Sequence, residues 1–166
     1  MRRKLHGLMA TTVELSTELD CTLQETWDWV RKPALLDHIA HPLIRFEYED
    51  GFDRSAPWPE GEHRVQIYAF GKAPIGWQVI VIEYADAPAG SFMLRDNGYS
   101  PMIKRWDHWI ILKPGSSPQA THYTDRVHIE AGLLTPGVAA YAKRFYAHRQ
   151  KRWRALASSD FAALKA

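Results

Sequence analysis

Cysteine is nearly absent from this sequence of 166 residues, which contains only Cys21. A single cysteine cannot form an intrachain disulfide, and it supplies no thiol cluster for zinc. Chains without disulfides are typical of reducing compartments. We therefore expect a cytoplasmic protein whose core holds together without cross-links.

Long apolar runs are also missing, because charges or prolines interrupt every run before the roughly 20 residues of a membrane span. The first residues carry a basic cluster but too few apolar side chains for a signal-peptide core. The length fits one ordinary domain. Because no long apolar run occurs, we expect no membrane insertion. We expect a flexible tail at residues 1–11, a domain at residues 12–157 and a second tail at residues 158–166.

Motifs that hold cofactors or nucleophiles are lacking as well. Gly71 and Gly76 have no Gly-Lys-Ser/Thr partner, and no Gly-x-Ser-x-Gly sequence occurs. His38 and His41 have a helical spacing, but Pro42 follows directly and no further ligand lies nearby in sequence. We expect no cofactor and no metal site.

The net charge of +2 is small, which argues against a general nucleic-acid coat. The distribution is nevertheless uneven, because residues 141–154 hold six bases and no acid. Such a run either faces phosphate groups or forms a solvated helix face that complements the helix dipole. We favour the solvated face.

Sequence patterns predict strands at residues 12–19, 43–49, 62–70, 77–84, 91–96, 103–112 and 121–130. Most alternate apolar with polar residues, whereas residues 77–84 are apolar on both faces, as expected of a strand covered on both sides. The short, turn-rich connections between the strands favour antiparallel neighbours and an α+β fold. Thr22 and Glu25 form a capping box for a short helix that Pro33 ends, and a second short helix fits residues 34–40.

A long helix is expected from Thr135 and Pro136 to about Ala157. Its apolar stripe continues into arginines at positions 149 and 152, where burial would favour leucine. That half of the helix is therefore expected to leave the sheet or to line a polar opening. The stripe comprises Val138, Tyr141, Ala142, Phe145, Arg149, Arg152 and Leu156.

The last two strands form a hairpin around residues 114–119. Pairing Leu112 with Thr121 places His108 opposite Asp125, and it places Asp107 opposite Arg126 on the solvent side. A slip of two residues would change the partners but not the faces. The inward face then holds Trp106, His108, Ile110, Tyr123, Asp125 and Val127.

The His108 and Asp125 pair is the best candidate for chemistry, because the carboxylate could orient the imidazole for acid–base work. Buried polar groups are, however, nearly always satisfied by a neighbour. No nucleophile is identified beside the pair. We interpret it as pocket wall first and as a catalytic pair second.

The element order and four segments resemble the SRPBCC superfamily, also called START-like, over roughly residues 12–157. The segments are residues 22–27, 105–108, 121–127 and 145–149, which are similar to bacterial members without an assigned substrate. The resemblance implies a helix-grip fold, with a curved sheet of about seven strands around the last helix. It also implies a cavity between them, open near the two short helices. Its expected lining is Tyr68, Trp106, His108, Ile110, Tyr123, Asp125, Val127, Tyr141 and Phe145.

Three functions follow from the sequence and this resemblance. The first is a monomer or weak homodimer that binds a small hydrophobic or aromatic molecule, such as a lipid or polyketide. The second is a polyketide cyclase or aromatase in which His108 and Asp125 act as acid and base, with Tyr68 or Tyr123 as proton donor. The third is an interaction module that uses the basic last helix or an exposed Trp58 loop.

Overall fold

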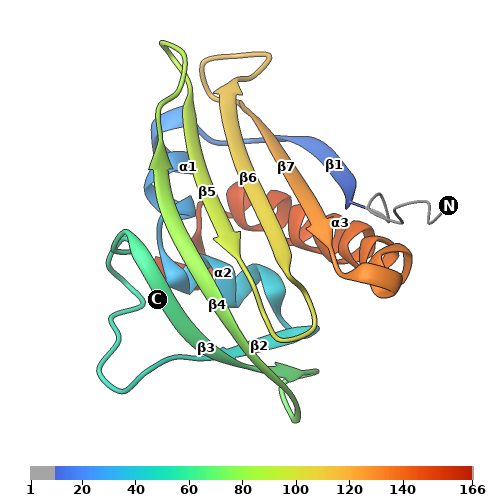
Figure 1. Ribbon diagram of the computed structural model, residues 1–166. Helices are drawn as coiled ribbons and strands as arrows, with labels where there is room; N and C mark the ends of the chain where they lie inside the picture. The colour runs from blue at the N-terminus through green and yellow to red at the C-terminus, as the bar shows by residue number, and fades with distance from the viewer. Residues whose placement is uncertain (1–9, 166) are drawn as a thin grey trace, which may run out of the picture.

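The computed structural model describes residues 10–165. Within this range, one curved sheet wraps around a long helix (Figure 1). The strands are β1 (Ala10–Leu19), β2 (Ile44–Glu47), β3 (Gly61–Ala69), β4 (Ala73–Ala85), β5 (Phe92–Gly98), β6 (Arg105–Pro114) and β7 (Thr121–Glu130). The helices are α1 (Leu23–Val30), α2 (Pro33–Ala40), a 3-10 turn η1 (Gly132–Leu134), α3 (Thr135–Ser158) and α4 (Ala162–Lys165).

The seven strands are antiparallel neighbours in the order β1-β7-β6-β5-β4-β3-β2. Helix α3 crosses one face of this sheet, with α1 and α2 on the same side (Figure 1). The expected α+β class and helix-grip architecture are therefore confirmed.

Local sequence signals account for where the helices begin. The Thr22 hydroxyl accepts a hydrogen bond from the Glu25 backbone N–H at 3.2 Å, as the capping box predicts. Pro33 and Pro136 lie in the first turns of α2 and α3, where a missing N–H costs nothing. Both short helices and the long helix thus occur where the sequence indicates.

The hairpin of β6 and β7 differs from its predicted register by two residues. Leu112 pairs with Tyr123 rather than with Thr121, because β6 continues to Pro114 and pairs there with Thr121. As expected for an even slip, every inward residue keeps its face. The predicted contact between Asp107 and Arg126 is wrong: Asp107 accepts from two other arginines, Arg95 and Arg105.

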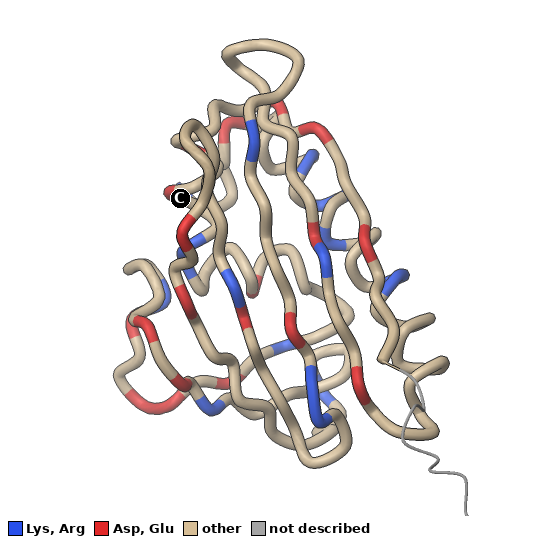
Figure 2. Tube along the Cα trace, turned by 45° about the horizontal axis from the view of Figure 1, so that its top comes forward, with Lys and Arg blue, Asp and Glu red and all other residues tan. Residues whose placement is uncertain are grey.

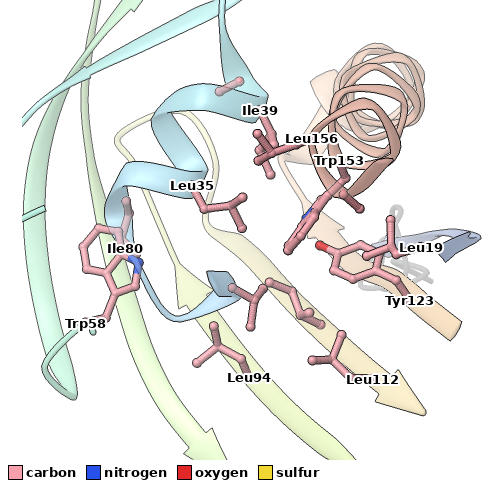
Figure 3. Packing of buried hydrophobic residues seen from close by; sticks show 14 of the residues in the cluster. Leu19, Leu35, Ile39, Trp58, Ile80, Leu94, Leu112, Tyr123, Trp153 and Leu156 are labelled. Carbon is pink, nitrogen blue, oxygen red and sulfur yellow. The ribbon is translucent and has the colours of Figure 1, made fainter. Parts of the chain in front are cut away.

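The main core lies between α3, the short helices and the sheet (Figure 3). Trp153 of α3 is fully buried between Tyr123 and Phe161, with ring centroids 5.6 and 6.1 Å away. Phe161 also stacks on Trp29 at 5.1 Å. Residues 159–165, which the sequence assigned to a carboxy-terminal tail, thus include α4 and pack on the core.

The expected amino-terminal tail falls mostly on residues 1–9, which lie outside the described residues. Strand β1 begins at Ala10, which pairs with Glu130. Within residues 10–165, no helix combines the length and the apolar character needed to cross a membrane.

Trp58 lies in the core, contrary to the expectation of an exposed loop. Only 4% of its surface is exposed, and its ring lies 5.4 Å from Phe52 and 5.9 Å from Tyr48. Its carbonyl accepts a hydrogen bond from the Tyr84 hydroxyl at 2.6 Å. The loop between β2 and β3 folds back and closes one side of the core.

Candidate functional site

A cavity of about 230 Å³ lies between the sheet and α3. Apolar and aromatic side chains make up most of its wall, with four polar side chains among them. A smaller cavity of about 50 Å³ shares Asp96, His108 and Arg149 with it. The lining of the larger cavity is Leu36, Ile44, Phe46, Ile67, Ile75, Gln78, Ile80, Asp96, Ile103, Trp106, His108, Val138, Tyr141, Phe145, Tyr146 and Arg149.

The mouth of the cavity lies at the end of the sheet where α3 begins. Ile75 and Tyr141 line the cavity and are 56% and 45% exposed, which marks the side that solvent reaches. Other exposed large apolar residues lie in the turns at this same end: Phe70, Tyr99, Met102, Leu133 and Leu134. The expected opening near the two short helices is therefore not where the most exposed wall residues lie.

Of the nine predicted lining residues, Trp106, His108, Tyr141 and Phe145 line this cavity. Ile110 lines the smaller one. The remaining four lie elsewhere. Tyr68 is on the outer side of the sheet, where it contacts Arg45 and Glu47, while Tyr123, Asp125 and Val127 are fully buried behind the cavity wall.

Asp125 is the centre of a buried hydrogen-bond network. Its Oδ1 lies 2.8 Å from His108 Nε2 and accepts from the Tyr123 hydroxyl at 2.9 Å. Its Oδ2 accepts from Gln150 Nε2 at 2.9 Å, and Gln150 also donates to the Leu15 carbonyl. Three side chains from β6, β7 and α3 thus satisfy one carboxylate, and the network fastens the helix to the sheet.

The protonation of the pair follows from its surroundings. Burial would raise the pKa of Asp125, but the hydrogen bond from His108 and the positive charge of Arg149 bring that pKa below its ordinary value. Burial lowers the pKa of His108, and this outweighs the hydrogen bond to Asp125. At neutral pH the carboxylate is ionised and the imidazole is neutral. Nε2 therefore carries the proton, and Nδ1 retains a lone pair.

Tyr146 positions His108 at the cavity wall. The two rings lie 4.7 Å apart between centroids, and the Tyr146 hydroxyl accepts a hydrogen bond from Trp106 Nε1 at 3.1 Å. Tyr146 is itself buried and belongs to α3. The imidazole is thus held between a carboxylate on the sheet and an aromatic ring on the helix.

Asp96 is a second carboxyl group in the cavity wall. Its Oδ1 accepts a hydrogen bond from the Val81 backbone N–H at 2.9 Å, and it forms no ion pair within residues 10–165. Burial is the main cause that raises the pKa of Asp96 to about 7, although the Val81 N–H and the charge of Arg149 oppose it. Near neutral pH this carboxyl can therefore either donate or accept a hydrogen bond.

Arg149 completes the polar part of the wall. It is 6% exposed, and its guanidinium carbon lies 5.0 Å from the Tyr146 ring and 5.6 Å from the Phe145 ring. Its Nε has no hydrogen-bond partner. Burial disfavours the charged form, but the negative charge of Asp125 opposes this and the pKa of Arg149 is raised. The side chain thus remains a cation inside the protein.

Sequence reasoning missed Asp96, Gln78 and Tyr146 as wall residues, and it also missed most of the apolar wall, such as Ile75 and Val138. A signal for Asp96 existed, because Phe92, Leu94 and Asp96 alternate along one strand and Leu94 is buried. No comparable pattern distinguished Tyr146 from its neighbours in the helix. The second half of the helix neither leaves the sheet nor lines an opening: Arg149 is buried in the cavity wall, and Trp153 and Leu156 pack in the core.

The basic run of the last helix does not form one surface. Figure 2 shows bases and no acids along α3, but their side chains lie in different surroundings. Arg149 is buried, and Arg152 donates to the His38 carbonyl at 2.8 Å. Four of the six bases are exposed: Lys143, Arg144, Lys151 and Arg154.

Several solved structures share this fold at low sequence identity. A START superfamily protein from Mycobacterium smegmatis superposes with a TM-score of 0.60 at 14% identity, over 89% of this chain and 97% of that one. An aromatase/cyclase from Streptomyces sp. R1128 gives a TM-score of 0.59 at 13% identity, over 90% and 94%. A protein from Thermus thermophilus gives 0.61 at 11% identity, over 90% and 99%. These likenesses establish an SRPBCC-like fold.

Sequence comparison gives a family without a known activity. A family model described as "Domain of unknown function (DUF8410)" matches residues 17–157. None of the curated protein sequences matches this chain. The match begins within β1 and ends near the end of α3, so it includes every element that forms the cavity.

Proposed function

This chain belongs to the DUF8410 family, and we propose that it binds a small hydrophobic or aromatic molecule in the cavity between the sheet and α3. The observation that supports this proposal most strongly is the cavity itself, which has mostly apolar walls and a few polar groups. A cavity of about 150 Å³ accommodates benzene. A volume of about 230 Å³ therefore suits one or two rings with a polar substituent. The buried, reduced Cys21 fits a cytoplasmic setting.

Filling the mouth of the cavity should abolish binding. Val138 of α3 lines the cavity, whereas Ala140 of the same helix is exposed. We expect Val138→Trp to weaken binding of the uncharged two-ring probe N-phenyl-1-naphthylamine by roughly tenfold or more, because the indole occupies the space of the probe. Probe fluorescence measures the affinity, and native mass spectrometry of protein purified from its host identifies any retained ligand.

Ala140→Trp is the matched control for this test, because it adds the same side chain on the outer side of the same helix. Its affinity for the probe should remain within about twofold of the original protein. If the original protein takes up no probe and retains no small molecule from its host, ligand binding is refuted. Equal loss in both tryptophan variants would also count against binding in this cavity.

A second candidate function is acid–base catalysis in the same cavity, favoured by His108 at the wall with ionised Asp125 directly behind it. Nδ1 of the neutral imidazole can take a proton from a carbon next to a ketone. The electron pair of the C–H bond then moves into an enolate and the imidazole becomes imidazolium. The imidazolium releases its proton to solvent, and a solvent proton is added to the carbon. The neighbouring fold of an aromatase/cyclase is consistent with such a step.

This second function predicts hydrogen exchange in a bound ketone. In D₂O, the protein should accelerate deuterium incorporation next to the carbonyl of 2-tetralone, as measured by NMR. His108→Gln retains a donor for Asp125 but has no basic nitrogen, so we expect it to reduce the acceleration by about 10²-fold or more. Exchange at the uncatalysed rate in the original protein would refute the catalytic function, and ligand binding would be the function that remains.

A further inference from the structure

Arg149 has N–H donors that the surrounding protein does not use. Guanidinium carries five N–H donors in a planar fork, yet within residues 10–165 it forms neither an ion pair nor a hydrogen bond. Buried charges are normally paired, because leaving water without a partner is costly. The unused donors line both cavities.

The nearby carboxylates do not take up these donors. Asp125 exerts an attraction on Arg149, but its two oxygens already accept from His108, Tyr123 and Gln150. Asp96 accepts from the Val81 backbone N–H and also forms no ion pair with Arg149. Both interactions with the arginine are therefore through space, and its N–H groups remain available to a molecule in the cavity.

The guanidinium of Arg149 forms cation–π contacts with two aromatic rings. The guanidinium carbon lies over Phe145 and Tyr146, one turn earlier in α3. Stacking of this kind orients the planar group without consuming its in-plane N–H donors. The guanidinium is therefore preorganised in the wall of a cavity whose other side chains are mostly apolar.

We infer that the ligand carries a carboxylate, which Arg149 binds through paired N–H donors while the apolar walls enclose the rest of the molecule. This inference rests on the proposed ligand binding and specifies its class as small hydrophobic or aromatic acids. A planar carboxylate matches the guanidinium fork better than a single carbonyl does. The carboxyl of Asp96, when protonated, can donate a further hydrogen bond to the same group.

An acid and its amide separate this inference from binding in general. At pH 6, we expect the protein to bind 2-naphthoate roughly tenfold or more tightly than 2-naphthamide, because the two differ in charge but hardly in shape. Arg149→Met should remove this preference, because the acid then loses the cation that binds it more strongly than it binds the neutral amide. Arg149→Lys should retain part of it. Isothermal titration calorimetry measures the affinity of the original protein and of both variants for the two probes.

Arg144→Met is the matched control, because Arg144 is an exposed base of the same helix. It should keep the full preference for the acid. Amide binding without any preference for the acid would overturn the carboxylate inference and leave the proposed function intact. An acid preference that persists in Arg149→Met would overturn the role of Arg149, and failure of both probes to bind would overturn inference and function together.

Discussion

Replacing Asp125 by alanine is expected to lower the free energy of unfolding by about 3–5 kcal/mol. The change removes the acceptor of three buried donors, on His108, Tyr123 and Gln150, and leaves a small void. Each donor loses its partner without gaining water. Urea unfolding at pH 7, followed by tryptophan fluorescence, measures the difference.

The penalty of Asp125→Ala should depend on pH in a defined direction. The pKa of Asp125 is depressed in the folded state, so the ionised carboxylate adds stability above its unfolded pKa of about 3.9. That contribution is lost as the pH falls through the folded-state pKa. The difference between variant and original protein should therefore shrink below about pH 4.

Asp20→Ala provides the control for this experiment, because Asp20 is exposed at the end of β1. It should change stability by less than about 0.5 kcal/mol. A cost below about 1 kcal/mol for Asp125→Ala would show that the network does little to hold the fold. The structural interpretation of the His108 and Asp125 pair would then be untenable.

Much of the fold was predictable because local signals and periodicity agree. The capping box at Thr22, the proline at position 136 and the alternation of the strands each indicate an element that the structure contains. The pairing register of the last hairpin was harder to predict from the sequence. Alternation defines which side chains share a face, but it does not distinguish Thr121 from Tyr123 as the partner of Leu112.

The candidate site was predictable only where periodicity determines the direction of a side chain. His108 and Asp125 meet despite the slip in register, because they are diagonal neighbours on the same face. Whether such a residue lines the cavity or lies behind it depends on α3, which covers Tyr123 and Asp125. That packing is a property of the assembled layers, and no single strand encodes it.

Replacing Asp96 by asparagine is expected to raise the free energy of unfolding at pH 8 by about 2 kcal/mol. The folded-state pKa of about 7 exceeds the unfolded value of about 3.9, so the folded protein keeps the proton longer than the unfolded chain does. Ionising this carboxyl therefore costs stability as the pH rises from about 4 to 7. Solvent that enters the cavity screens the charge, so we expect about half of the full effect of such a shift.

Asparagine retains an oxygen that can accept the Val81 N–H, so the variant removes the charge and keeps the hydrogen bond. The stability difference should be near zero at pH 4, grow up to pH 7 and stay constant above it, as measured by urea unfolding. The exposed Asp86→Asn is the control and should show no such profile. An equal difference at pH 4 and pH 8 would contradict the raised pKa. Asp96 lines the same cavity as Arg149 and His108, so a carboxyl that costs stability near neutral pH supports the proposed binding site.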